Sequence, residues 1–288
     1  MSHHNPPDPP AGSPAGQKRQ YFATGFRNVD TSGDPRAFRQ CLDQITGIPF
    51  FTEVKQKSIG IIAADTPALV LDAGCGAGTD LVALASSLQG KCRIIGIDAS
   101  ASLLSCAAGR VESIGERCSL VQGDILNLPF RDGSFSACRI DRVLQHIHDP
   151  GHGIRELTRV LAPQGRLIAF DNDWGTLSIS LDDSALASRM ARSWQESFAS
   201  GRIGRDLYGL FSASGLAEIH TEPCTLVLTD PAVAEWLYDI PHLLERMERA
   251  GSLAADERVA VNEEICRRGR EGTFSSRYTG YLVWGKRQ

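Results

Sequence analysis

The stretch from Ala68 to Asp98 constrains the fold more than any other part of this sequence. Ala68 to Leu71 is an apolar run that predicts a buried strand, and Thr79 to Leu88 has the apolar periodicity of a helix. A second apolar run, Arg93 to Ile97, predicts another strand that ends at Asp98. Glycines that alternate with small residues join the first strand to the helix. This unit is typical of the nucleoside-binding half of a doubly wound α/β sheet.

The spacing of the glycines indicates the kind of ligand that the turn binds. Gly74, Gly76 and Gly78 follow Asp72 as D-x-G-x-G-x-G. Dinucleotide sites instead have G-x-G-x-x-G, with a helix N-terminus open to the pyrophosphate. The Asp72 carboxylate would repel a pyrophosphate but could pair with an ammonium group. Asp98 lies about 20 residues beyond the last glycine, where an acid can accept hydrogen bonds from ribose hydroxyls. The pattern predicts a ligand with a ribose, an ammonium group and no diphosphate.

Three further motifs follow the glycine turn, and the four together resemble one known family. They are VLDAGCGAGT at 70–79, GIDAS at 96–100, GDILNLPF at 123–130 and RELTRVLAPQGR at 155–166. In this order and spacing they resemble the class I S-adenosylmethionine-dependent methyltransferases of the ubiquinone/menaquinone-methyltransferase-like type. Gln164 departs from the family, which usually has a second glycine there, but it lies in an expected turn before a strand.

The resemblance implies an α/β fold with a doubly wound, seven-stranded, mostly parallel sheet, an antiparallel final strand and helices on both faces. Residues 1–19, rich in Pro, Gly, Ser and Ala, are expected to form a disordered tail. Residues 20–65 are expected to form N-terminal cap helices. Residues 66–288 would form the Rossmann-like methyltransferase domain, with a helical insertion after strand five at about 182–214 and another at about 231–270.

The resemblance also implies S-adenosyl-L-methionine as the cofactor and assigns residues to bind it. The acid at Asp98 would hold the ribose, Asp124 the adenine amine and the backbone of Ile125 a ring nitrogen. Leu103 matches a position whose apolar side chain lies against the adenine, and Arg142 could hold the methionine carboxylate. The complete expected set is Asp72, Gly74, Gly76, Gly78, Asp98, Ala99, Leu103, Asp124, Ile125 and Arg142.

The candidate acceptor site lies beyond the expected fourth and fifth strands, because ligands bind at the carboxyl ends of parallel strands. Asp141 and His146 are the candidate catalytic residues there. His146 could be a general base, since the unperturbed pKa of histidine is near neutral. The alternative is that His146 only forms hydrogen bonds with the backbone.

The fifth strand is expected at Arg166 to Phe170 and to end in Asp171-Asn-Asp-Trp174 at the edge of the crevice. Two carboxylates, an amide and an indole there suggest a pocket wall for a polar or cationic substrate. The alternative is that Trp174 packs as a lid and the acids cap the loop. The candidate substrate-binding residues are Tyr21, Gln145, Asp171, Asp173, Trp174 and Arg205.

Composition excludes several other classes of function. The formal net charge is −4 over 288 residues and the basic residues are scattered, so we expect no nucleic-acid partner. No apolar run approaches the roughly 18 to 20 residues of a membrane span, and we expect no signal peptide. Eight dispersed cysteines without a C-x-x-C pair indicate reduced thiols in the cytoplasm. No His or Cys set has metal-ligand spacing, so no metal is expected. The oligomeric state stays open.

The expected reaction is methyl transfer from S-adenosylmethionine to a small-molecule acceptor at oxygen, nitrogen or carbon, in secondary metabolism. One alternative is another use of the same cofactor, such as 3-amino-3-carboxypropyl transfer or cyclisation. The by-product separates these reactions, since methyl transfer yields S-adenosylhomocysteine and the aminocarboxypropyl route yields methylthioadenosine. A binding module without activity and a nicotinamide oxidoreductase are further alternatives. Intact Asp72, Asp98 and Asp124 argue against the first, and the glycine spacing argues against the second.

Overall fold

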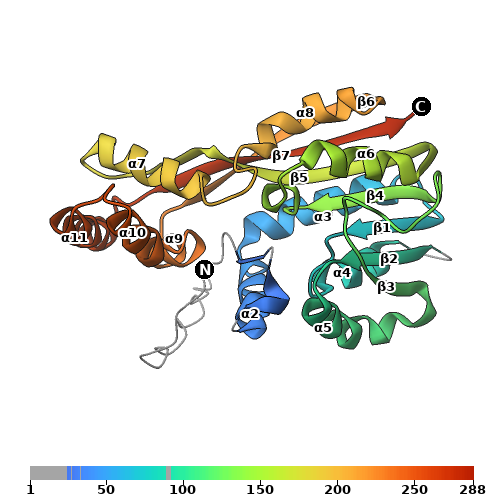
Figure 1. The fold of residues 1–288 in the computed structure, drawn as a ribbon, viewed down its shortest axis with the longest axis horizontal. Coiled ribbons are helices and arrows are strands. Elements are labelled where there is room, and N and C mark those ends of the chain that lie inside the picture. The colour runs from blue at the N-terminus through green and yellow to red at the C-terminus, as the bar shows by residue number, and fades with distance from the viewer. Residues whose placement is uncertain (1–24, 27, 33, 89–91) are drawn as a thin grey trace, which may run out of the picture.

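The computed structural model describes residues 25–288 except 27, 33 and 89–91, so the expected tail at 1–19 and Tyr21 lie outside the described residues. Its centre is a seven-stranded sheet (Figure 1). The strands are β1 (Leu69–Ala73), β2 (Arg93–Asp98), β3 (Cys118–Gln122), β4 (Phe135–Asp141), β5 (Leu161–Ile179), β6 (Leu216–Leu228) and β7 (Ser276–Arg287).

The strand order is β3-β2-β1-β4-β5-β7-β6. All pairs from β3 to β5 are parallel, whereas β7 runs antiparallel to both β5 and β6. The order reverses at β1, with β2 on one side and β4 on the other. Ligands bind at such a switch point, beyond the carboxyl ends of the strands. The expected doubly wound sheet with an antiparallel final strand is confirmed.

Helices cover both faces of this sheet, because successive side chains of each strand point to opposite sides. Val70 packs into an apolar cluster with α3 and α4, and Leu71 packs into another with α6 and α8. The helical elements are η1 (Val29–Thr31), α2 (Pro35–Ile45), α3 (Pro49–Ala63), α4 (Thr79–Ser87), α5 (Ala101–Val111), η2 (Glu112–Arg117), η3 (Leu144–His146), α6 (Pro150–Val160), α7 (Ser184–Gln195), α8 (Ile203–Ala213), α9 (Pro231–Leu237), α10 (Ile240–Arg249) and α11 (Ala255–Glu271).

Strand β5 is longer than the sequence predicts. We expected it at 166–170, but it spans 19 residues and ends at Ile179. Residues 171–173, expected at the crevice edge after the strand, pair in register with residues 279–281 of β7. The ladder of β7 satisfies the backbone of this polar run, so the run continues the strand.

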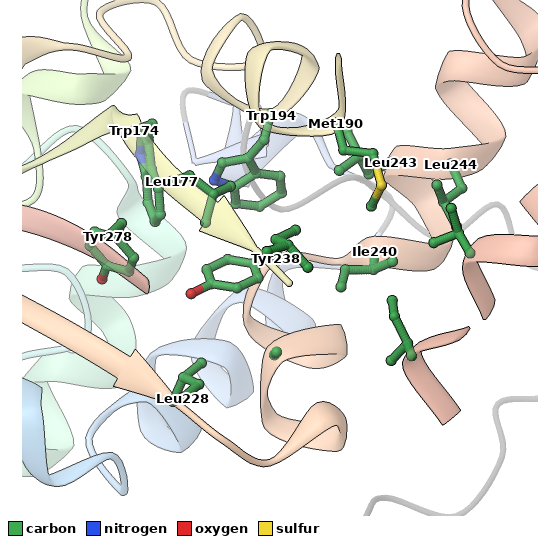
Figure 2. Packing of buried hydrophobic residues seen from close by; sticks show 14 of the residues in the cluster. Trp174, Leu177, Met190, Trp194, Leu228, Tyr238, Ile240, Leu243, Leu244 and Tyr278 are labelled. Atoms are coloured by element: carbon green, nitrogen blue, oxygen red, sulfur yellow. The ribbon is translucent and has the colours of Figure 1, made fainter. Parts of the chain in front are cut away.

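The far ends of β5, β6 and β7 build a second apolar core with α7, α9, α10 and α11. Figure 2 shows Trp174, Trp194, Tyr238 and Tyr278 gathered at its centre. The Trp174 and Tyr278 rings lie 4.4 Å apart between centroids. The C-terminal insertion is therefore packed around the end of the sheet and shares strand β5 with the central core.

Candidate active site

The glycine turn lies between β1 and α4, and its three glycines have different roles. Gly74, Gly76 and Gly78 all have positive φ, at 73°, 53° and 80°. A Cβ on Gly74 would lie 2.3 Å from Val143, and one on Gly78 would be similarly close to α5. A Cβ on Gly76 would meet nothing closer than Leu42 of α2, at 3.4 Å. Gly76 is thus the place where a ligand can approach the backbone closely, beneath α2.

Asp98 lies half-buried at the carboxyl end of β2 and joins the glycine turn to the next loop. Its Oδ2 accepts a hydrogen bond from Gly76 N at 2.8 Å, and its Oδ1 accepts one from Ser100 N at 2.9 Å. Burial raises the pKa of Asp98, and these two hydrogen bonds oppose the rise. A carboxylate has about four lone-pair sites, so acceptor capacity remains for ribose hydroxyls. The exposed Ala99 follows in the same loop.

The residues expected at the adenine lie around β3 and α5. Asp124 is exposed and accepts a hydrogen bond from the backbone N–H two residues on, at 2.9 Å. Ile125 is buried. Leu103 is also buried, in a small apolar cluster with Val29 and Phe38 of the N-terminal segment. The N-terminal segment, which contains η1 and α2, therefore packs on the side of α5 where the adenine is expected.

A buried arginine that the sequence analysis did not single out lies beneath the turn. Arg139, in the middle of β4, is 2% exposed. Its Nη1 pairs with Asp72 Oδ1 at 2.9 Å, and its Nη2 pairs with Asp80 at 2.9 Å and Asp141 at 2.5 Å. Its Nε donates to Ser58 Oγ at 3.1 Å. The signal was an arginine inside an otherwise apolar strand, directly beside Asp72 in the sheet register.

Burial and this network shift the pKa values of Asp72 and Asp80 in opposite directions. Burial raises its pKa to about 6, against the opposing charge of Arg139. Burial also acts to raise the pKa of Asp80, but Arg139 and Lys55 together lower it to about 2. One oxygen of the carboxylate expected to bind an ammonium group is therefore already held by a guanidinium.

Arg142 and Asp141 lie next to each other at the carboxyl end of β4. Arg142 has a positive φ of 55°, its Nε donates to Asp141 Oδ1 at 3.0 Å, and its guanidinium lies 4.5 Å from the ring centre of Phe51. Because Asp141 is held on one side by Arg139 and on the other by Arg142, it orients both cations. Arg142 thus lies at the carboxyl end of β4, and its binding to the methionine carboxylate stays a prediction.

Gln145 connects the crevice to the second core. Its Oε1 accepts hydrogen bonds from Trp174 Nε1 at 2.8 Å and from Asn172 Nδ2 at 3.3 Å. Since an indole N–H only donates, this fixes the orientation of the amide. Gln145 Nε2 then faces His146 Nε2 at 3.2 Å, and an amide nitrogen only donates. In this orientation of the amide, His146 Nε2 is the acceptor.

The His146 ring lies between two aromatic side chains from distant parts of the chain. Its centroid is 5.5 Å from that of Phe26 and 5.7 Å from that of Phe198. Phe26 belongs to the N-terminal segment, and Phe198 follows α7. These three rings lie side by side near the carboxyl end of β4.

The residues expected to form an exposed pocket wall at the end of β5 are buried in the strand. Asp171 is fully buried, accepts hydrogen bonds from Asn172 N and Gln145 N, and burial raises its pKa to about 7. Asp173 is held by Arg205 in an ion pair. Trp174 is 4% exposed and packs in the second core. The expected crevice edge is therefore a buried polar run inside β5, because pairing with β7 continues the strand and both of its faces are covered there.

Three further properties of the described residues follow. Within residues 25–288, as far as they are described, no group of three or more His, Cys, Asp or Glu side chains is placed to hold a metal ion. No helix in the described part of the chain is long and apolar enough to cross a membrane. All eight cysteines are free thiols.

Comparison with known proteins finds a family similarity in the central part of the chain. Residues 70–165 match the methyltransferase domain family. An uncharacterized 37.1 kDa protein of transposon Tn4556 from Streptomyces fradiae is 35% identical over 215 residues, covering 74% of this chain and 62% of that protein. A demethylmenaquinone methyltransferase of Lactiplantibacillus plantarum is 33% identical over 119 residues, covering 41% of this chain and 50% of that protein.

A solved structure gives a similar fold. Phosphoethanolamine N-methyltransferase 2 of Haemonchus contortus, in complex with S-adenosyl-L-methionine, aligns with 94% of this chain and 61% of its own, at a TM-score of 0.55 and 16% identity. At that identity the likeness concerns the fold. The chain spans between half and two thirds of the length of the two relatives described above.

Proposed function

We propose that this chain is a class I S-adenosylmethionine-dependent methyltransferase that transfers a methyl group to a small-molecule acceptor, because residues 70–165 match the methyltransferase domain family and the sequence resembles a demethylmenaquinone methyltransferase. The observation that supports this most directly is the junction of Asp98 with Gly76 at the switch point of the sheet. It joins a carboxylate with spare acceptor capacity to a backbone that a ligand can approach closely. No diphosphate is needed to explain either feature.

In this proposal the chain holds the cofactor at three places. Asp98 accepts hydrogen bonds from the ribose, and the Asp124–Ile125 pair contacts the adenine. Arg142 offers its guanidinium to the methionine carboxylate, while Asp72 faces the amino group. When bound, the cofactor supplies a methyl group activated by the sulfonium. The chain supplies alignment, which can lower such a barrier by roughly 7 to 11 kcal/mol.

His146 would act on the acceptor only after a local change. Its Nε2 lone pair is engaged by Gln145, so accepting a proton there requires that hydrogen bond to be exchanged. Its two aromatic neighbours restrict water, which favours dispersal of the positive charge as the methyl group moves. A hydroxyl acceptor would need such a base, whereas an enolate or free amine would not.

We place the acceptor among small molecules because the net charge of −4 with scattered basic residues does not favour nucleic acid. The free thiols support a reducing, cytoplasmic setting. Secondary metabolism is the setting that we propose for the reaction. The acceptor atom, whether oxygen, nitrogen or carbon, is open in this proposal.

Calorimetric titration of the purified protein with S-adenosylmethionine, S-adenosylhomocysteine and NADH tests the proposal. We expect binding of the first two compounds and none of NADH. The Asp98→Ala variant should bind the sulfur compounds more weakly, and the exposed Asp132→Ala variant is its matched control. Absence of binding by either sulfur compound would overturn the assignment. Mass spectrometry after incubation with candidate acceptors then identifies the by-product. S-adenosylhomocysteine indicates methyl transfer, and methylthioadenosine indicates aminocarboxypropyl transfer.

A further inference from the structure

The N-terminal segment makes an unusual polar contact with α5. The carboxylate of Asp30, in η1, accepts hydrogen bonds from Ser100 Oγ at 2.6 Å, Ala101 N at 2.8 Å and Ser102 N at 3.0 Å. Ser100 Oγ in turn accepts from Leu103 N at 3.1 Å. The first three amides of α5 are thus satisfied, two of them by a side chain about 70 residues earlier in the chain.

These contacts keep Asp30 charged. The hydrogen bond from Ser100 is the largest cause of a pKa lowered to about 2. A carboxylate at a helix N-terminus is also favoured by the helix dipole. The same loop carries Asp98, whose Oδ1 accepts from Ser100 N. Asp30 therefore holds the same loop that carries Asp98, the acid expected to bind the ribose.

The same segment is also attached at the other end of α5. Arg110, in the last turn of α5, pairs with Asp43 of α2 at 2.5 Å. It also donates to Ala77 O at 3.1 Å and to Thr79 Oγ1 at 2.6 Å, both next to Gly78 in the turn. Between the two attachments, Val29 and Phe38 pack on Leu103. The elements η1 and α2 thus both contact α5, and Figure 1 shows α2 beside α5.

The segment with η1 and α2, called the cover below, also reaches the side of the site where the acceptor is expected. Leu42 lies 3.4 Å from the position of a Cβ on Gly76, and the Phe26 ring contacts both Phe38 and His146. A ligand that reaches Gly76 and Asp98 would therefore lie beneath the segment from Phe26 to Asp43. Movement of the described part of this segment would open the site on that side.

We propose that Asp30 is a positioning residue that holds this cover closed over the adenosyl half of the cofactor site and sets the rate of cofactor release. The inference rests on the proposed function for the identity of the ligand. The contact between Asp30 and α5 does not depend on the proposed function, because it is formed by the protein without a ligand. The residues that Asp30 contacts belong neither to the sheet nor to the two large apolar clusters, so this contact can break while both stay packed.

The test compares Asp30→Ala with Asp34→Ala. Asp34 lies in the same segment and caps α2 through Arg36 N and Ala37 N, at 3.1 and 3.3 Å, so its loss removes a charge and a helix cap but not the α5 contact. Hydrogen exchange of the ligand-free proteins is measured at the amides of Ala101 and Ser102. Stopped-flow displacement then gives the release rate of S-adenosylhomocysteine. A circular dichroism melt of each variant checks that it is folded.

We expect Asp30→Ala to speed exchange at these amides and to speed S-adenosylhomocysteine release by about tenfold or more, the scale for losing charge-assisted hydrogen bonds. Asp34→Ala should change neither. Unchanged exchange at Ala101 and Ser102, faster exchange without faster release, or equal acceleration by both variants would each overturn the proposal. If the wild type binds no S-adenosylhomocysteine, the proposed function fails, and with it the assigned role in release, while hydrogen exchange still shows whether the contact exists.

Discussion

Replacing Arg139 with methionine tests whether this buried guanidinium is the counter-charge that allows β1 and β4 to carry acids. Its side chain is 2% exposed and pairs with Asp72, Asp80 and Asp141. Methionine keeps much of the volume but removes the charge and the hydrogen bonds. Removing one partner of a buried ion pair typically costs about 3–5 kcal/mol. Because domains are stable by only about 5–15 kcal/mol, we expect a large fall in the free energy of unfolding.

The loss should fall mainly on Asp72 and should depend on pH. Asp80 keeps Lys55 and Asp141 keeps Arg142, but among the described residues Asp72 has its ion pair with Arg139 alone. The pKa of Asp72 is already raised to about 6, and losing Arg139 raises it further. A carboxyl with a raised native pKa binds more protons in the folded state, so stability falls as pH rises. The deficit of the variant should therefore be larger at pH 8 than at pH 5.

Urea unfolding followed by circular dichroism at both pH values measures this effect. The exposed Arg155→Met substitution is the matched control and should change stability by no more than about 0.5 kcal/mol. The double variant with Asp72→Asn should recover part of the loss, with an interaction of about 0.5–3 kcal/mol. A deficit below about 1 kcal/mol at pH 8, or no recovery in the double variant, would show that the carboxylates do not depend on Arg139.

Three further predictions follow from the site. Asp98→Ala should weaken S-adenosylhomocysteine binding by about 1–3 kcal/mol in calorimetry, the range for a hydrogen bond to a charged group; unchanged affinity in the folded variant would refute the ribose assignment. Because burial raises the pKa of Asp171 to about 7, the wild type should lose stability from pH 5 to pH 8 as this acid ionises. Asp171→Asn should flatten that profile in thermal melts, and identical slopes would contradict the cause. His146→Ala should leave S-adenosylhomocysteine affinity within about twofold, because its ring lies on the acceptor side; a loss of tenfold or more, about 1.4 kcal/mol, would move His146 to the cofactor.

The first two strands, the glycine turn and α4 could be predicted because local patterns specify them. The first strand, the glycine turn and α4 form within about 20 residues, and their boundaries were predicted to within a residue or two. Asp98 was predicted at the end of β2, where it lies. These features depend on apolar periodicity and on glycine at positive φ, and both are visible in a single sequence.

The rest could not be predicted because it depends on contacts between distant segments. The polar run at 171–173 is typical of a loop, and only pairing with residues 279–281 makes it a strand. Two of the three acids that pair with Arg139 come from other elements, Asp72 from β1 and Asp80 from α4, so the strand that carries Arg139 does not show what balances its charge. Asp30 lies in a short polar stretch whose partner is about 70 residues away. No local pattern connects these pairs.

The length of β5 has a consequence for how this protein unfolds. Its first half packs in the central core through Leu167 and Ala169, and its second half packs in the second apolar core through Leu177 and Ile179. Neither core can lose this strand without exposing apolar surface of the other. The two halves should therefore melt together, as a single calorimetric transition whose van't Hoff and measured enthalpies agree.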